Sequence, residues 1–144
     1  MSKNLYLWTS KTHYLHKTFL YYYIMFINSN INLKEFAKSQ KTIIQANLQN
    51  SEFQLKDLVE ASNMSRSKYI STFKDAFGKT PIAVVNEYRM KKAAHMIETT
   101  SYTMKRIAFE VGFTDRHYFC RCFKSFYHMT TTEYKTQVAA KKKR

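Results

Sequence analysis

Residues that interrupt helices are almost missing from this sequence. Two glycines and one proline occur in 144 residues, whereas the tight turns of a sheet protein depend heavily on both residue types. This scarcity argues against an all-β protein and predicts an all-α fold. Because 44% of the residues are hydrophobic, a chain of this length can bury the core of one domain of ordinary size.

Cysteine is equally scarce. The two cysteines, Cys120 and Cys122, are two residues apart, and on a helix they would point about 200° away from each other. That spacing favours neither a disulfide nor the C-x₂₋₄-C pattern of a zinc site, even with His117 and His128 nearby. The sequence also has no glycine-rich phosphate loop and no nucleophile paired with a base. We therefore expect no metal, no cofactor and no enzymatic activity.

Acidic residues are few as well, and this imbalance indicates a partner. The chain has 24 Lys and Arg against 10 Asp and Glu, a formal net charge of +14. Such an excess is larger than solubility requires and favours nucleic acid as the partner, with an anionic membrane surface second. The apolar run over residues 19–27 is too short to span a bilayer and lacks a signal-peptide cleavage site. The expected location is the cytoplasm; the alternative is that this run is the remnant of a longer parent's sensor or membrane region.

The sequence contains one pattern twice. The first copy runs from Leu55 to Lys74 and the second from Met104 to Lys124, with equivalent residues 49 positions apart before the turn and 50 after it. Each copy predicts an apolar-faced helix, a turn that tolerates left-handed backbone, a side-chain N-cap and a second helix. The predicted turn residues are Asn63 and Gly112, and the predicted caps are Ser65 and Asp115. This order is typical of a helix-turn-helix motif.

Spacing and end signals extend this pattern along the chain. Asn32 and Glu35 form a capping box, so we expect a cooperative domain to begin there. Helices are predicted over residues 32–50, 54–62, 65–77, 81–99, 103–111 and 115–126, with a last helix from about residue 130. The expected division is an N-terminal segment of undecided structure over 1–31, a double helix-turn-helix domain over 32–138 and a disordered basic tail over 139–144.

The helix predicted over residues 81–99 is the longest. It would be ~28 Å long, close to the roughly 34 Å between successive major-groove faces of B-DNA, and this suits a spacer between two reading helices. Its predicted apolar face consists of Ile82, Val85, Tyr88, Ala93, Met96 and Ile97. Its cationic residues Arg89, Lys91 and Lys92 are expected to contact phosphate or to pair with Glu87 or Glu98.

A family likeness rests on the stretches over residues 64–81, 88–94 and 107–124, above all on the run GFxDxxxFxxxFK that begins at Gly112. On these residues the chain resembles the DNA-binding domain of the AraC/XylS family of bacterial transcription regulators. The resemblance implies seven helices, with the third and sixth entering adjacent major-groove segments and the fourth holding them apart. His128, Thr130 and Thr131 replace the family's usual Gly, Ser or Thr, and Pro, so the last helix is expected to start differently or to be held less firmly.

The candidate DNA-contacting residues are those left facing outward once the apolar residues of the third and sixth helices face inward. They are Arg66, Ser67, Ile70, Ser71 and Lys74 on the third helix, and Arg116, His117, Cys120, Arg121 and Lys124 on the sixth. Arg116 and Arg121 suit bidentate contacts to guanine, Ile70 a thymine methyl and Lys74 a phosphate. The alternative for each arginine is an ordinary solvated charge.

The predicted function is a sequence-specific transcription regulator, expected to be an activator, that binds double-stranded DNA and contacts RNA polymerase. The resemblance implies a short member of the family, without a sensor domain, that acts as a monomer or weak dimer in the bacterial cytoplasm, associated with the nucleoid. Two alternatives stay open. One is a truncated relative that antagonises related regulators by protein contact through residues 21–27; the other is a non-specific nucleic-acid binder.

Overall fold

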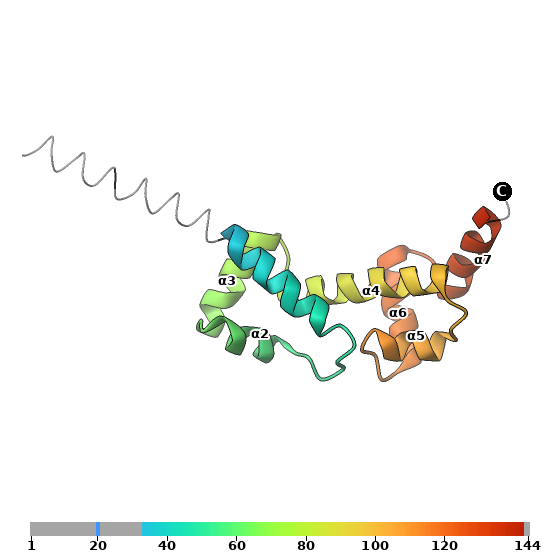
Figure 1. The fold of residues 1–144 in the computed structure, drawn as a ribbon, viewed down its shortest axis with the longest axis horizontal. Coiled ribbons are helices and arrows are strands. Elements are labelled where there is room, and N and C mark those ends of the chain that lie inside the picture. Colours follow the sequence, from blue (N-terminus) through green and yellow to red (C-terminus); the bar gives the residue numbers. More distant parts are fainter. Residues whose placement is uncertain (1–19, 21–32, 143–144) are drawn as a thin grey trace, which may run out of the picture. The chain divides into compact units, whose positions relative to one another are not determined.

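The computed structural model describes residue 20 and residues 33–142, and this part of the chain is helical, with no strand (Figure 1). After a helix over residues 33–46 come α2 (Leu55–Ser62), α3 (Arg66–Phe77), α4 (Pro81–Thr99), α5 (Met104–Glu110), α6 (Arg116–Tyr127) and α7 (Thr131–Lys142). The predicted all-α, seven-helix class is confirmed. Within the described residues, no helix is both long and apolar enough to cross a membrane.

Residues 1–36 and residues 37–144 form two separate compact parts of the chain. All contacts described below lie within residues 37–144. The predictions for the N-terminal segment, including the aromatic run over 21–27 and the capping residue Asn32, lie outside the described residues. The first helix ends at residue 46, four residues earlier than predicted. The Asn47 side-chain Nδ2 donates to the Ile43 carbonyl at 2.9 Å, which satisfies one of the last helical carbonyls and favours termination there.

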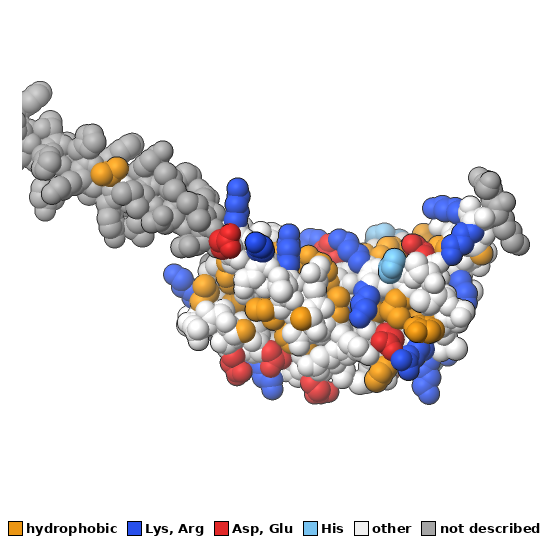
Figure 2. Space-filling view, viewed as in Figure 1, with side chains coloured by type: hydrophobic (Ala, Val, Ile, Leu, Met, Phe, Trp, Pro, Cys, Tyr) orange, Lys and Arg blue, Asp and Glu red, His pale blue; other side chains and the backbone are white. Residues whose placement is uncertain are grey.

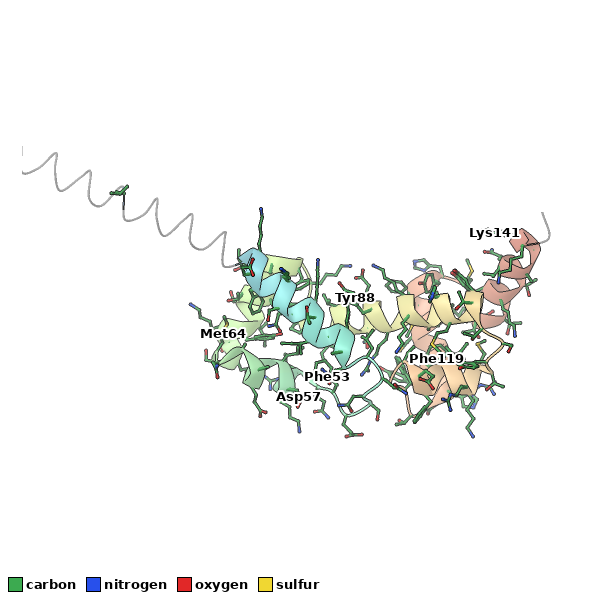
Figure 3. The ribbon with its side chains drawn as sticks, viewed as in Figure 1. Phe53, Asp57, Met64, Tyr88, Phe119 and Lys141 are labelled. Atoms are coloured by element: carbon green, nitrogen blue, oxygen red, sulfur yellow. The ribbon has the colours of Figure 1, made fainter. Side chains whose placement is uncertain are left out.

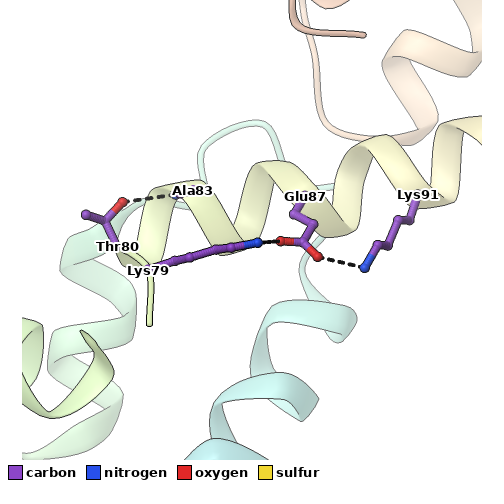
Figure 4. A network of polar contacts seen from close by, with 5 residues as sticks. All are labelled: Lys79, Thr80, Ala83, Glu87 and Lys91. Atoms are coloured by element: carbon purple, nitrogen blue, oxygen red, sulfur yellow. Dashed lines mark hydrogen bonds and ion pairs between the residues drawn. The ribbon is translucent and has the colours of Figure 1, made fainter. Parts of the chain in front are cut away.

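Side-chain caps mark the starts of α3, α4, α5 and α6, each within one residue of its prediction. Thr80 Oγ1 accepts from the Ala83 amide at 3.4 Å at the start of α4 (Figure 4), and Thr103 Oγ1 accepts from the Arg106 amide at 3.2 Å at the start of α5. Because each cap satisfies an amide that has no helical acceptor, it marks the helix start locally.

The start of α7 is also capped; the departure from the family pattern predicted that this helix would start differently or be held less firmly. The Thr130 amide donates to Glu133 Oε2 at 2.6 Å, and the Glu133 amide donates back to Thr130 Oγ1 at 3.2 Å. This reciprocal pair is a capping box, and it replaces the proline in starting the helix. The helix then continues to Lys142, so residues 139–142 extend α7 where a disordered tail was predicted.

The long helix α4 connects the two halves of the domain (Figure 1): it packs on α3 in the first half and on α5, α6 and α7 in the second. Its buried residues include the predicted Val85, Ala93 and Ile97. The predicted apolar face is wrong in one place, because Ile82 is 46% exposed. The largest difference is Arg89, which is only 8% exposed although it was predicted to contact phosphate or to pair with a glutamate.

Of the other cations of α4, Lys91 pairs with Glu87 as predicted, whereas Lys92 donates instead to a backbone carbonyl. Figure 4 shows Glu87 between two lysines: its carboxylate lies 2.6 Å from Lys79 Nζ and 2.7 Å from Lys91 Nζ. Hydrogen bonds from these two ammonium groups, Lys79 first, hold the pKa of Glu87 below its usual value. Lys92 turns the other way and donates to the Glu110 carbonyl at the end of α5, at 3.1 Å.

Candidate nucleic-acid interface

The first helix-turn-helix unit is α2, a turn at Asn63 and α3. Asn63 has φ 53°, the left-handed conformation that asparagine tolerates better than most residues. Ser65 then caps α3 by accepting from the Lys68 amide at 3.4 Å. On the inner side of α3, the Tyr69 hydroxyl donates to Gln40 Oε1 at 2.8 Å inside the core, and burial raises the pKa of that hydroxyl. This side of α3 is therefore fixed against the first helix.

The outer side of α3 presents the predicted contact residues together. Arg66, Ser67, Ser71 and Lys74 are exposed, and Ile70 is half-buried. Because the apolar residues Tyr69 and Phe73 are fully buried on the opposite side, the helix cannot rotate these residues inward.

The second unit repeats this construction with α5, a turn at Gly112 and α6. Gly112 has φ 82°, and Asp115 caps α6 by accepting from the amides of His117 at 2.6 Å and Tyr118 at 3.0 Å. Those two hydrogen bonds, Tyr118 first, lower the pKa of the Asp115 carboxyl. Phe119 lies inside this unit (Figure 3) and, with Phe123, is fully buried.

Four of the five residues predicted on the outer side of α6 are exposed, namely Arg116, His117, Arg121 and Lys124. Cys120 differs: it is half-buried, packs against the core of the second unit, and its Sγ lies 4.0 Å from Thr131 Oγ1. The cause is α7, whose first residue covers this position. Phe126, near the end of the same helix, is 38% exposed.

Tyr118 belongs to the same surface, although it is not among the predicted contact residues. Its side chain is 50% exposed, and the Arg121 guanidinium lies over its ring, 5.6 Å from the centroid. A hydrogen bond with Cys122 raises the pKa of the Tyr118 hydroxyl. The i, i+3 spacing of an aromatic and an arginine on one helix is the signal that could have indicated this pair.

The charge of the domain suits an anionic partner. In the face that Figure 2 shows, Lys and Arg side chains lie over both helix-turn-helix units. Within the described residues, no group of His, Cys, Asp and Glu is arranged to hold a metal ion.

Two helix-turn-helix units joined by one helix, each with cations on the outer side of its second helix, define the class of tandem helix-turn-helix DNA-binding domains. The family described as "Helix-turn-helix domain" matches residues 58–137, more than half of the chain. The chain belongs, through this domain, to the AraC/XylS family of DNA-binding transcription regulators.

Individual relatives agree with this assignment. The HTH-type transcriptional regulator MtrA of Neisseria gonorrhoeae is 33% identical over 86 residues, which are 60% of this chain and 29% of MtrA. The C-terminal domain of the response regulator yesN from Fusobacterium nucleatum is 32% identical, with a TM-score of 0.66, over 68% of this chain and 95% of that domain. The DNA-binding domain of AdpA, 18% identical with a TM-score of 0.70, shares the fold over 75% of this chain and 96% of its own.

The likeness to MtrA concerns only part of that protein, since this chain spans less than a third of its length. What MtrA does as a whole protein is therefore not carried over to this chain.

Proposed function

We propose that this protein binds specific sites on double-stranded DNA through α3 and α6, placed in two adjacent major-groove segments, and activates transcription from there. The observation that carries the proposal is that both second helices bury one side completely and expose cations and hydroxyls on the other. A supporting observation is that the structure of AdpA, which shares the fold, is that of a complex with a target DNA.

Each exposed side chain has a role in this proposal. Arg116 and Arg121 on α6, and Arg66 on α3, contact base edges, because a guanidinium can donate two parallel hydrogen bonds to guanine. The exposed Lys74 and Lys124 contact phosphates near the last turns of their helices. Ser67, Ser71 and His117 also contact the DNA, more weakly. Ile70 contacts a thymine methyl. Cys120 is half-buried, so only the exposed part of its side chain can contact DNA.

The rest of the proposal concerns the setting. The protein acts without catalysis, in the bacterial cytoplasm, as a monomer or weak dimer, and contacts RNA polymerase at the promoter. Residues 32–138 form the DNA-binding domain, and residues 1–31 are not needed for site recognition.

The test separates specific recognition from attraction by charge. Sites selected from random DNA by the full chain are measured against random DNA of equal length while the salt is raised from about 0.1 to 0.3 M, which weakens the phosphate contribution. We expect the preference for the selected site to persist. A protein that binds by charge alone would lose all preference between the two DNAs, and this result would overturn the proposal.

A matched pair of double variants sharpens that test. Arg116→Ala with Arg121→Ala removes two positive charges from α6, and Lys105→Ala with Arg106→Ala removes two exposed charges from α5. The α6 pair should abolish the preference for the selected site, whereas the α5 pair should weaken binding to both DNAs equally. Equal behaviour of the two pairs would contradict the assignment of α6. Activation is measured separately, with a promoter carrying the selected site fused to a reporter.

A further inference from the structure

Arg89 lies where three segments of the domain meet. From the middle of α4, its Nη2 donates to the carbonyl of Asn50 at 2.9 Å, in the turn that follows the first helix. Its guanidinium carbon also lies 5.7 Å from the centroid of the Phe113 ring, in the turn of the second helix-turn-helix unit. One side chain therefore contacts both halves of the domain.

The two halves also meet directly beside Arg89. A Cβ on Gly112 would lie 2.5 Å from the Leu48 carbonyl oxygen and 3.0 Å from Arg89 Cζ, so only a glycine lets the turn of the second unit come this close. At the surface of the same junction, Gln49 Nε2 donates to Glu110 Oε2 at 2.9 Å. The junction therefore includes close backbone contact, one buried cation and one exposed hydrogen bond.

Burying an arginine at this junction costs free energy, because its charged group is removed from water. Burial lowers the pKa of Arg89, and its Nε has no hydrogen-bond partner among the described residues. An apolar side chain of similar size commonly stabilises a protein as well as or better than a buried charge does. What an apolar side chain cannot do is form a directed bond to the Asn50 carbonyl while facing the Phe113 ring.

We infer that Arg89 is a positioning residue that sets the spacing at which α3 and α6 read DNA. This inference rests on the proposed function. Arg89 connects α4 to the turn after the first helix and to the turn before α6. These contacts hold the two helix-turn-helix units as one rigid body. A rigid domain fits only one separation of the two DNA half-sites. An added base pair shifts the second half-site by about 3.4 Å along the DNA axis and also rotates it about that axis.

The DNA test uses the selected site and two derivatives, with one base pair inserted or deleted between the half-sites. The wild-type chain should prefer the unaltered spacing by roughly tenfold or more, since loss of one half-site forfeits most of the linked affinity. Arg89→Met, which keeps the buried stem and removes the guanidinium, should lower this preference to about twofold or less. Binding to either isolated half-site should stay unchanged.

Two further variants keep the test decisive. Lys92→Met removes a charge and a carbonyl contact from the same helix, but that contact joins α4 to α5 within the second half, so its spacing preference should equal that of the wild type. Arg89→Lys retains the charge yet lacks the planar fork; it should relax the spacing preference too, and it serves if Arg89→Met does not fold.

A measurement without DNA separates this inference from the proposed function. Backbone ¹⁵N relaxation should give one tumbling time for both halves of the wild-type chain and two different times for the folded Arg89 variant. If the variant keeps one tumbling time and the full spacing preference, Arg89 does not set the spacing and the inference is wrong. If the wild-type chain selects no site at all but tumbles as one body, the proposed function fails while the mechanical role of Arg89 stands.

Discussion

The two helix-turn-helix units are built on one pattern, yet their turns meet different surroundings. In the first unit the left-handed position is Asn63, at φ 53°, and in the second it is Gly112, at φ 82°. Asparagine suffices where only the backbone angle matters. Glycine is required at the second turn because the Leu48 carbonyl lies where a Cβ would be. The difference shows that the second turn has a second task, which is contact with the other half of the domain.

The inner sides of α3 and α6 differ in a related way. At equivalent positions α3 has Tyr69, with its hydroxyl bonded to Gln40, and α6 has Phe119, in a wholly apolar cluster with Phe113 and Phe123. The inner side of α3 therefore includes a buried polar pair, whereas the equivalent side of α6 is held by aromatic and aliphatic packing.

The largest effect should come from a methyl group added at the second turn. Gly112→Ala should cost about 3 kcal/mol or more, because the left-handed backbone and the overlap with the Leu48 carbonyl add together. Gly78→Ala is the matched control, with φ +67° and nothing within 4 Å of its Cβ, and should cost about 1 kcal/mol. Urea unfolding of both variants measures the difference; equal losses would mean that the junction yields without strain.

The second comparison concerns the buried polar pair. Tyr69→Phe gives α3 the side chain that α6 has, and it should cost about 1–3 kcal/mol because the buried Gln40 oxygen loses its donor. Adding Gln40→Leu should recover most of that loss, since no unsatisfied polar group then remains. The free energy of unfolding of the two variants is the readout. A double variant no more stable than Tyr69→Phe alone would show that the hydrogen bond is not what the first unit depends on.

The third comparison concerns the reading surfaces. Arg121→Ala should cost about 1–3 kcal/mol on the selected site and little on random DNA, and Arg66→Ala should cost less, because α6 offers more donors than α3. Competition binding with both DNAs gives the two numbers. Should Arg66→Ala prove the more damaging on the selected site, the ranking of the helices is reversed.

The smallest effect is expected at the caps. Ser65 caps α3 with one hydrogen bond and Asp115 caps α6 with two. Ser65→Ala should therefore cost about 0.5–1 kcal/mol at any pH near neutrality.

The contribution of the Asp115 cap to stability should depend on pH. Since its pKa is lowered in the folded state, that contribution is present above the ordinary carboxyl pKa and is lost as the pH falls through the lowered folded pKa. Thermal melts of Asp115→Ala and the wild type should converge in acid; a constant difference would rule out the ionised cap as its source.

Local signals predicted most of this fold, and contacts with other segments account for the misplaced side chains of Arg89 and Cys120. The caps Ser65, Thr80, Thr103 and Asp115 fixed the helix starts, because each acts on amides within three residues. The burial of Arg89 depends on an acceptor 39 residues away in sequence, and no periodicity on α4 can indicate such a partner. Cys120 is half-buried for the same kind of reason, since the residue beside it, Thr131, belongs to the next helix.

The contact of Arg121 with the Tyr118 ring has a consequence for the affinity and the dissociation rate of the proposed DNA complex. Because the guanidinium already rests over the ring in the free protein, its side chain has less rotational freedom to lose on binding, and each immobilised side chain of this kind costs about 0.5–1.5 kcal/mol. In the proposed complex the ring would therefore strengthen binding without touching a base. The benefit should appear as slower dissociation, since differences among variants of one interface fall mostly on the off-rate.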